Sequence, residues 1–253
     1  MRASDSFLCV VWLVLVLTGL ARVQGEQPGP RQQWKFTASA LDGNQLRPAI
    51  GKLAGEIKGS FSLSEQSGLD CLRLGPADSP SGGGILLTTE QDAADLPVAA
   101  MSVEAWVAVD ETAEWGGIVG AVLDSGTREA GWVLGYRKDR FYFGLATEGP
   151  GRITYLQSGS PMLLKAWYHL VATYDGAGEQ RLYLDGRLDG RRAGQQGAIL
   201  RPEPLFYCIG AYRDDNDYNP FTGRLAEVSV WHRALGPEEV AARFEERKNL
   251  FPG

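Results

Sequence analysis

The sequence predicts an all-β fold: a two-sheet antiparallel sandwich with one short C-terminal helix. Short apolar segments recur from residue 34 onward, with turn residues between them. Residues 167–185 follow the pattern of a strand, a turn and a second strand that ends in Asp-Gly, the dipeptide that tight hairpin turns favour. A helical pattern is found only after Pro237.

Alternation of apolar residues places the individual strands. The expected strands are residues 34–38, 59–63, 69–74, 84–88, 101–109, 117–123, 131–136, 140–146, 152–157, 166–174, 180–185, 205–210 and 221–231. Segment 101–109 carries apolar side chains on both faces. We assign Val103, Ala105, Val107 and Val109 to one face and Met101, Trp106 and Ala108 to the other. The pattern predicts a strand in a curved sheet with something packed on each side.

The expected helix begins at Pro237, because proline suits the first helical turn. Glu238 and Glu239 then lie near the positive end of the helix dipole, and Arg247 lies toward its negative end. Val240, Ala241 and Phe244 are spaced to face the sandwich.

The N-terminus has the features of a secretory signal peptide. Arg2 precedes an apolar run over residues 7–20, and small residues lead to Gly25. A membrane anchor is the alternative, but this run is shorter than the roughly 20 residues that cross a bilayer. We expect a signal peptide at 1–25, a flexible leader at 26–33 and one sandwich domain at 34–253. The predicted location is secreted or extracellular, with the periplasm or a cell surface as alternatives.

Composition narrows the partners. The formal net charge is −6 at pH 7, which argues against nucleic acid or an anionic membrane. No membrane span is expected after signal cleavage. Cys71 and Cys208 survive that cleavage, and two readings stay open: a disulfide bond between them, as in exported proteins, or two separate buried thiols.

Several motifs follow one another in a specific order. They are Met-Ser-Val-Glu-Ala-Trp-Val at 101–107, Trp-Tyr-His-Leu-Val-Ala-Thr-Tyr-Asp-Gly at 167–176, Leu-Tyr-Leu-Asp-Gly at 182–186, Phe-Thr-Gly-Arg-Leu-Ala-Glu-Val at 221–228 and Arg-Ala-Leu-Gly-Pro-Glu-Glu-Val at 233–240. Together they resemble the laminin-G-like, concanavalin A-type jelly-roll family over nearly the whole chain. The resemblance implies a non-catalytic extracellular recognition domain that binds carbohydrate or protein, in some members through calcium.

The resemblance also implies one metal site, formed by an early loop and the acidic pair of the last strand. The corresponding candidates are Asp42, Asn44 and Glu227. The first acidic position of that pair is Ala226 in this chain, which removes one ligand.

The densest group of polar residues is the loop at 212–220. Asp214, Asp215, Asn216 and Asp217 offer the oxygen atoms that calcium prefers, although the loop lacks the glycine and glutamate of an EF-hand. The alternative is a solvated acidic turn. Calcium is thus the one cofactor that the sequence offers.

A glycan needs an aromatic surface and planar hydrogen-bonding groups. Trp115, in an expected loop, is the first candidate for that surface, followed by Tyr212, Arg213 and Tyr218. Trp115 has an alternative role as a cover for the edge of the core.

The predicted function is a secreted, non-catalytic recognition or adhesion module that binds a glycan or an extracellular protein. His169 and His232 lie within strand patterns, and the usual hydrolase motifs are missing from the sequence. The alternatives are a glycoside-active enzyme of the same superfamily, whose carboxylate pair the sequence does not reveal, and an accessory domain of a secreted hydrolase.

Overall fold

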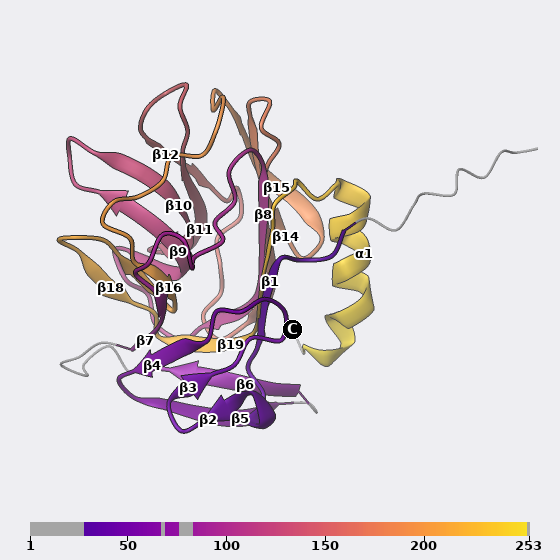
Figure 1. Ribbon diagram of the computed structural model, residues 1–253. Helices are drawn as coiled ribbons and strands as arrows, with labels where there is room; N and C mark the ends of the chain where they lie inside the picture. The colour runs from indigo at the N-terminus through magenta and orange to yellow at the C-terminus, as the bar shows by residue number, and fades with distance from the viewer. Residues whose placement is uncertain (1–27, 67–68, 76–82, 252–253) are drawn as a thin grey trace, which may run out of the picture.

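Two antiparallel β-sheets, packed face to face, form the body of the molecule (Figure 1). The computed structural model describes residues 28–66, 69–75 and 83–251. The expected signal peptide lies outside these ranges. The sandwich, with one short α-helix among the described residues, confirms the predicted fold class.

Sheet A, the eight-stranded sheet, lies beside the helix. In order across the sheet its strands are β15 (Arg187–Ala193), β14 (Glu179–Leu184), β13 (Trp167–Tyr174), β8 (Met101–Val109), β19 (Gly223–Trp231), β6 (Leu69–Leu74) and β5 (Phe61–Gln66). The eighth strand, β1 (Gln32–Lys35), pairs with β19. Strands distant in the sequence therefore lie side by side, as the pairing of β8 with β19 shows.

Sheet B, the nine-stranded sheet, forms the other layer. Its strands, in order, are β12 (Ile153–Gln157), β11 (Arg140–Ala146), β10 (Glu129–Arg137), β9 (Gly116–Asp124), β16 (Tyr207–Ile209), β7 (Gly84–Thr88), β4 (Gly55–Lys58), β3 (Gln45–Leu46) and β2 (Leu41–Asp42). A separate hairpin, β17 (Ala211–Arg213) and β18 (Tyr218–Pro220), follows β16. Its contacts with β9 place it against sheet B.

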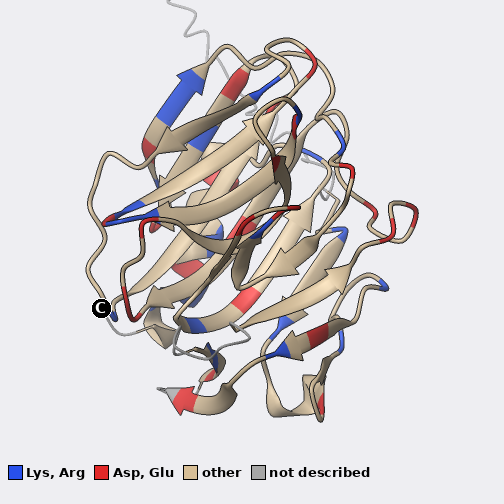
Figure 2. Ribbon diagram, turned by 90° about the vertical axis from the view of Figure 1, so that its left-hand side faces the viewer, with Lys and Arg blue, Asp and Glu red and all other residues tan. Residues whose placement is uncertain are grey.

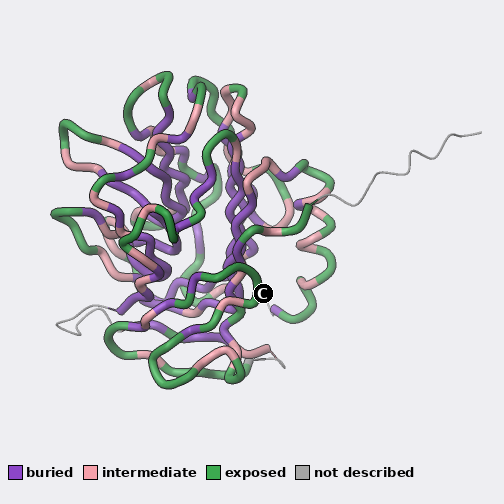
Figure 3. Tube along the Cα trace, viewed as in Figure 1, coloured by how far each residue is buried: buried purple, intermediate pink, exposed green. Residues whose placement is uncertain are grey.

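The main core lies between the two sheets (Figure 3). Trp34 and Tyr207 meet edge to face there, with ring centroids 6.1 Å apart, and Trp132 also meets Tyr207 edge to face, at 5.9 Å. A buried side chain of this size contributes roughly 1.5–3 kcal/mol through the apolar surface removed from water. The core side chains come from both sheets, so each sheet would expose an apolar inner face to water without the other.

Sheet A is apolar on its outer face as well. Helix α1 (Pro237–Arg247) covers that face, and Phe251 stacks on Trp106 of β8 with ring centroids 3.9 Å apart. This confirms the prediction that β8 packs on both sides. Met101 is a correction: it points into the inter-sheet core with Val103, as its odd position in the alternation requires.

None of the described helices is long and apolar enough to cross a membrane.

The first strand starts earlier than expected, within the segment predicted to be a flexible leader. Strand β1 begins at Gln32 rather than at Trp34. The buried Gln32 side chain donates to the carbonyl oxygen of Ala94 and accepts the hydroxyl of Tyr207. These two bonds satisfy a polar side chain that the leader interpretation left in solvent.

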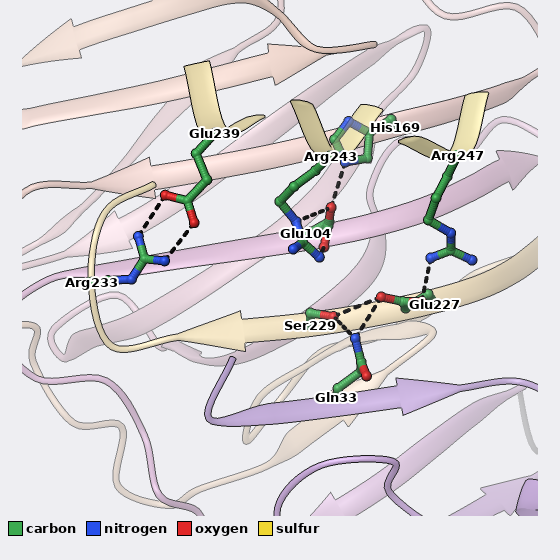
Figure 4. Close-up of polar contacts among 9 residues, drawn as sticks. All are labelled: Gln33, Glu104, His169, Glu227, Ser229, Arg233, Glu239, Arg243 and Arg247. Atoms are coloured by element: carbon green, nitrogen blue, oxygen red, sulfur yellow. Dashed lines mark hydrogen bonds and ion pairs between the residues drawn. The ribbon is translucent and has the colours of Figure 1, made fainter. Parts of the chain in front are cut away.

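Charged side chains fix α1 to sheet A (Figure 4). Arg243 donates to both oxygens of the buried Glu104, over 2.9 and 2.6 Å, and His169 Nε2 lies 2.7 Å from the same carboxylate. One turn further along the helix, Arg247 pairs with Glu227, which also accepts a hydrogen bond of 2.8 Å from Gln33. We call this group of residues the helix clamp. It joins α1 to β8, β13, β19 and β1.

Replacement of Glu104 tests the helix clamp. Glu104→Gln leaves Arg243 without its buried counter-charge, so we expect the free energy of unfolding to fall by about 3–5 kcal/mol. The matched control is Asp42→Asn, which removes an exposed pair with Arg47 and should cost less than about 1 kcal/mol. Urea denaturation measures both. Equal effects of the two variants would show that the clamp does not hold the helix.

The comparison of the wild type with Glu104→Gln should also depend on pH. Burial alone raises the pKa of Glu104, but the hydrogen bonds and charges of His169 and Arg243 outweigh it, so this pKa lies below its ordinary value of 4.5. The stability that ionised Glu104 adds is present above pH 4.5 and is lost as the pH falls through the lowered pKa. The free energies of unfolding of the wild type and Glu104→Gln, measured in urea melts, should therefore become more similar below pH 4.5.

Candidate functional site

The predicted binding residues on the β17–β18 hairpin face two opposite sides. Its register pairs Arg213 with Tyr218 and Tyr212 with Asn219, so neighbouring residues along each strand face opposite ways. Gly117 of β9 allows the hairpin to lie close to sheet B, because a Cβ atom there would be only 2.0 Å from the backbone nitrogen of Tyr212. The hairpin thus has one side against sheet B and one side toward solvent.

Asp214 holds the turn of the hairpin. One carboxylate oxygen accepts the backbone N–H groups of Asn216 and Asp217, over 3.0 and 2.6 Å, and the other accepts that of Asp124 over 3.3 Å. Asp214 is only 4% exposed, and burial raises its pKa although these N–H groups oppose the shift. Its role is that of an aspartate side chain closing a turn.

A pocket of about 530 Å³ opens beside this turn. The guanidinium of Arg213 lies 4.4 Å from the ring centroid of Phe206 and 5.7 Å from that of Tyr218. Tyr218 is 39% exposed, and Lys58 of β4 lines the pocket from a different strand. We call this the hairpin pocket. It combines two aromatic surfaces, two cations and the oxygen atoms of Asp215 and Asp217.

The surroundings of the hairpin pocket carry both signs of charge. In Figure 2 the acidic and basic segments alternate over the side of the molecule that lies at the left in Figure 1. Arg128 is 3.9 Å from Asp215, and Lys58 pairs with Glu56. This mixture suits a neutral polar ligand better than a highly charged polymer.

Trp115 and Tyr212 do not join the hairpin pocket. Tyr212 is 5% exposed and belongs to an aromatic cluster on the outer face of sheet B. Trp115 packs there on Tyr142 and Tyr155, with ring centroids 5.3 and 5.2 Å away, and Arg137 covers its ring at 4.6 Å. Trp115 therefore covers buried side chains, which is the second of the two roles that the sequence left open for it.

The structure adds two residues that sequence reasoning missed. Phe206 lies just before β16, and its neighbour Tyr207 points into the core, so alternation turns Phe206 outward. This alternation was readable in the segment 205–210. Lys58 gave no such signal, because it reaches the pocket only through the pairing of β4 with β7.

The predicted calcium ligands lie in three separate parts of the structure: Asp214 to Asp217 in the hairpin, Asp42 on sheet B and Glu227 on sheet A. Asp214 already accepts three N–H groups, whereas calcium needs about six to eight oxygen atoms. Asp42 pairs with Arg47 on sheet B, and Glu227 is held by Arg247 on sheet A. Across residues 28–66, 69–75 and 83–251, no three Asp, Glu, His or Cys side chains are grouped to hold a metal ion.

Of the two readings left open for Cys71 and Cys208, the structure has the two separate buried thiols and no disulfide bond between them, which corrects the assignment of these cysteines as a disulfide pair. Cys71 on β6 packs beneath α1 on the outer face of sheet A, with its sulfur 3.1 Å from the hydroxyl of Ser64. Cys208 alternates with core residues Tyr207 and Ile209 and so points to the outer side of sheet B. The whole inter-sheet core separates the two free thiols. Burial raises the pKa of the Cys208 thiol to about 12, although the nearby Arg213 opposes the shift.

The chain belongs to the concanavalin A-like lectin/glucanases superfamily, because a laminin G family model with that description matches residues 81–241. Pappalysin-1 of Mus musculus is 26% identical over 178 residues, which cover 66% of this chain and 11% of that protein. The chain spans about a tenth of the length of the curated relatives it matches.

Solved structures show the same fold at low identity. The binding domain of Paraclostridial Mosquitocidal Protein 1 superposes with a TM-score of 0.64 and 12% identity, over 87% of this chain and 52% of that chain. Domain 4 of AbnA, an extracellular GH43 arabinanase from Geobacillus stearothermophilus, was solved with arabinotriose. Its TM-score is 0.58 at 15% identity, over 86% of this chain and 98% of that chain.

Asp214→Ala separates a structural aspartate from a calcium ligand. The variant leaves buried N–H groups without acceptors, so we expect a loss of about 1–3 kcal/mol in the free energy of unfolding. The loss should be the same with millimolar calcium and with EDTA, in urea melts of both proteins. A wild-type protein that gains stability from calcium, when Asp214→Ala does not, would contradict this assignment.

Proposed function

We propose that the chain is a non-catalytic extracellular recognition module that binds a glycan in the hairpin pocket. The observation that supports it most directly is the placement of Arg213 between the rings of Phe206 and Tyr218, beside an open cavity. The family membership and the arabinotriose-bound relative support a sugar as the ligand. The signal-peptide pattern at 1–25 supports the extracellular location.

The chemistry of the hairpin pocket matches that of a neutral sugar. The C–H face of a pyranose or furanose ring packs on an aromatic side chain, for which Tyr218 and Phe206 provide the surface. Arg213 then donates hydrogen bonds to sugar hydroxyl oxygens, and the carboxylates of Asp215 and Asp217 accept hydrogen bonds from sugar hydroxyl groups. Because Phe206 holds the guanidinium in place, less side-chain entropy is lost on binding.

A non-catalytic role agrees with the state of the buried carboxylates. Glu104 and Glu227 lie on adjacent strands of one sheet face, the kind of pair that a glycosidase needs. Each is instead paired with an arginine of α1, and the helix covers both. In the hairpin pocket, the carboxyl of raised pKa is Asp214, whose oxygens are occupied by backbone N–H groups.

Substitutions in the hairpin pocket test the proposal. A glycan array selects the strongest ligand, and calorimetry then compares the wild type with Arg213→Ala and Tyr218→Ala. We expect each variant to bind about tenfold more weakly or worse, since Arg213 donates charged hydrogen bonds, each worth about 1.5–3 kcal/mol, and Tyr218 supplies the aromatic surface on which the sugar packs. Urea melts should show little change, because both side chains are partly exposed.

The matched control is Arg137→Ala, which removes the same kind of arginine from the ring of Trp115. Its affinity for the selected glycan should equal that of the wild type. If Arg137→Ala weakened binding while Arg213→Ala did not, the ligand would belong to the Trp115 cluster instead. The absence of any array signal from folded protein would overturn a glycan as the ligand.

A further inference from the structure

A second pocket, of about 450 Å³, lies on the other layer of the sandwich. It is bounded by α1, by the turn between β14 and β15, and by the loop that precedes β13. The rings of Tyr168 and Phe244, with Leu184 and Pro161, give it an apolar lining. We call it the helix-side pocket. It shares no lining residue with the hairpin pocket.

The walls of the helix-side pocket are held in fixed positions. Asp185 and Gly186 form the turn with φ angles of 49° and 76°, a left-handed pair that suits a tight hairpin. The turn rests directly on the helix, because a Cβ atom on Gly186 would be 3.0 Å from the Cβ of Phe244. On the opposite wall, the hydroxyl of Tyr168 accepts the N–H of Leu163. The cavity is thus preformed.

Three carboxylates also line the helix-side pocket: those of Asp185, Asp189 and Glu245. Asp185 accepts the N–H of His169 over 2.9 Å, and Asp189 accepts both the hydroxyl and the N–H of Ser160, over 2.6 and 3.0 Å. Glu245 projects from α1 and pairs at the surface with Lys248. Arg187 is the one basic side chain among the lining residues, so the pocket carries an excess of negative charge.

The loop that supplies Ser160 and Pro161 to the pocket also carries two exposed leucines. Leu163 and Leu164 follow Pro161 in the loop and are 69% and 46% exposed. Neighbouring exposed leucines on a soluble protein indicate a contact surface for another polypeptide. Aromatic lining residues, oriented carboxylates and exposed leucines in the adjoining loop together complement one chemical group: a basic side chain between apolar neighbours.

We propose that the helix-side pocket binds an arginine side chain of a partner protein, next to apolar residues that cover the exposed leucines. The planar guanidinium stacks on Tyr168 or Phe244 and donates to Asp189 and Glu245. A metal ion is a poorer occupant, since Asp185 and Asp189 already accept hydrogen bonds and much of the lining is apolar. This site is independent of the glycan proposal.

The test uses the full chain and a series of synthetic peptides, Ser-Gly-Leu-X-Leu-Gly-Ser, in which X is arginine, citrulline or glutamate. Citrulline keeps the shape of arginine without its charge. NMR titration should show shifts of the backbone amides of Gly186 and Asp189 with the arginine peptide. Citrulline should weaken binding by about tenfold or more, and the glutamate peptide should not bind.

Isosteric variants locate the contact. Asp189→Asn and Glu245→Gln should each weaken the arginine peptide several-fold, whereas Glu238→Gln, an exposed control on the same helix, should not. Arginine and citrulline peptides of equal affinity would overturn the proposal. So would unchanged binding to both pocket variants, or shifts confined to the β17–β18 hairpin. Glycan binding, measured on the same variants, reports separately on the hairpin pocket.

Discussion

The feature on which the structure depends is that sheet A has two apolar faces. One face meets sheet B across the inter-sheet core, and the other carries Trp106, Trp167 and Trp231. A sheet with only one covered face would leave these rings in water, so the chain must supply a second layer. Helix α1 and Phe251 form that layer. The buried charges of the helix clamp then set where the helix lies, because Glu104 and Glu227 each need a cation close by.

Because both faces of sheet A are covered, a ligand has to bind elsewhere on the molecule. The face of sheet A that carries Glu104 and Glu227 is closed by α1, and the outer face of sheet B is partly covered by its own aromatic cluster. Open cavities with several kinds of side chain lie instead at the margins, where the hairpin meets sheet B and where α1 meets the β14–β15 turn. A rigid sandwich with binding groups on its connecting segments is the usual arrangement of recognition domains.

Local signals in the sequence predicted the fold well. The alternation in residues 101–109 indicated a sheet packed on both sides, and Asp185-Gly186 indicated the hairpin turn that the structure contains. Arg213 and Tyr218 were found because the hairpin loop is dense in polar and aromatic residues. Long-range pairings gave no local signal: Glu104 and Arg243 are 139 residues apart, and Lys58 reaches the hairpin pocket only through the sheet order. The packing of Trp115 and Tyr212 gave no local signal either, because aromatic residues in an expected loop look the same in sequence whether or not neighbouring strands cover them.

We propose that glycan recognition occurs in the hairpin pocket, at the margin of sheet B, because α1 closes the outer face of sheet A and an aromatic cluster covers part of the outer face of sheet B. A crystal structure of the chain with the oligosaccharide selected by the glycan array tests this most directly. The account predicts a sugar ring against Phe206 and Tyr218, with hydroxyls bonded to Arg213, and α1 still seated on Trp106. A sugar bound over Trp115, or beneath a displaced α1 at Glu104 and Glu227, would contradict it.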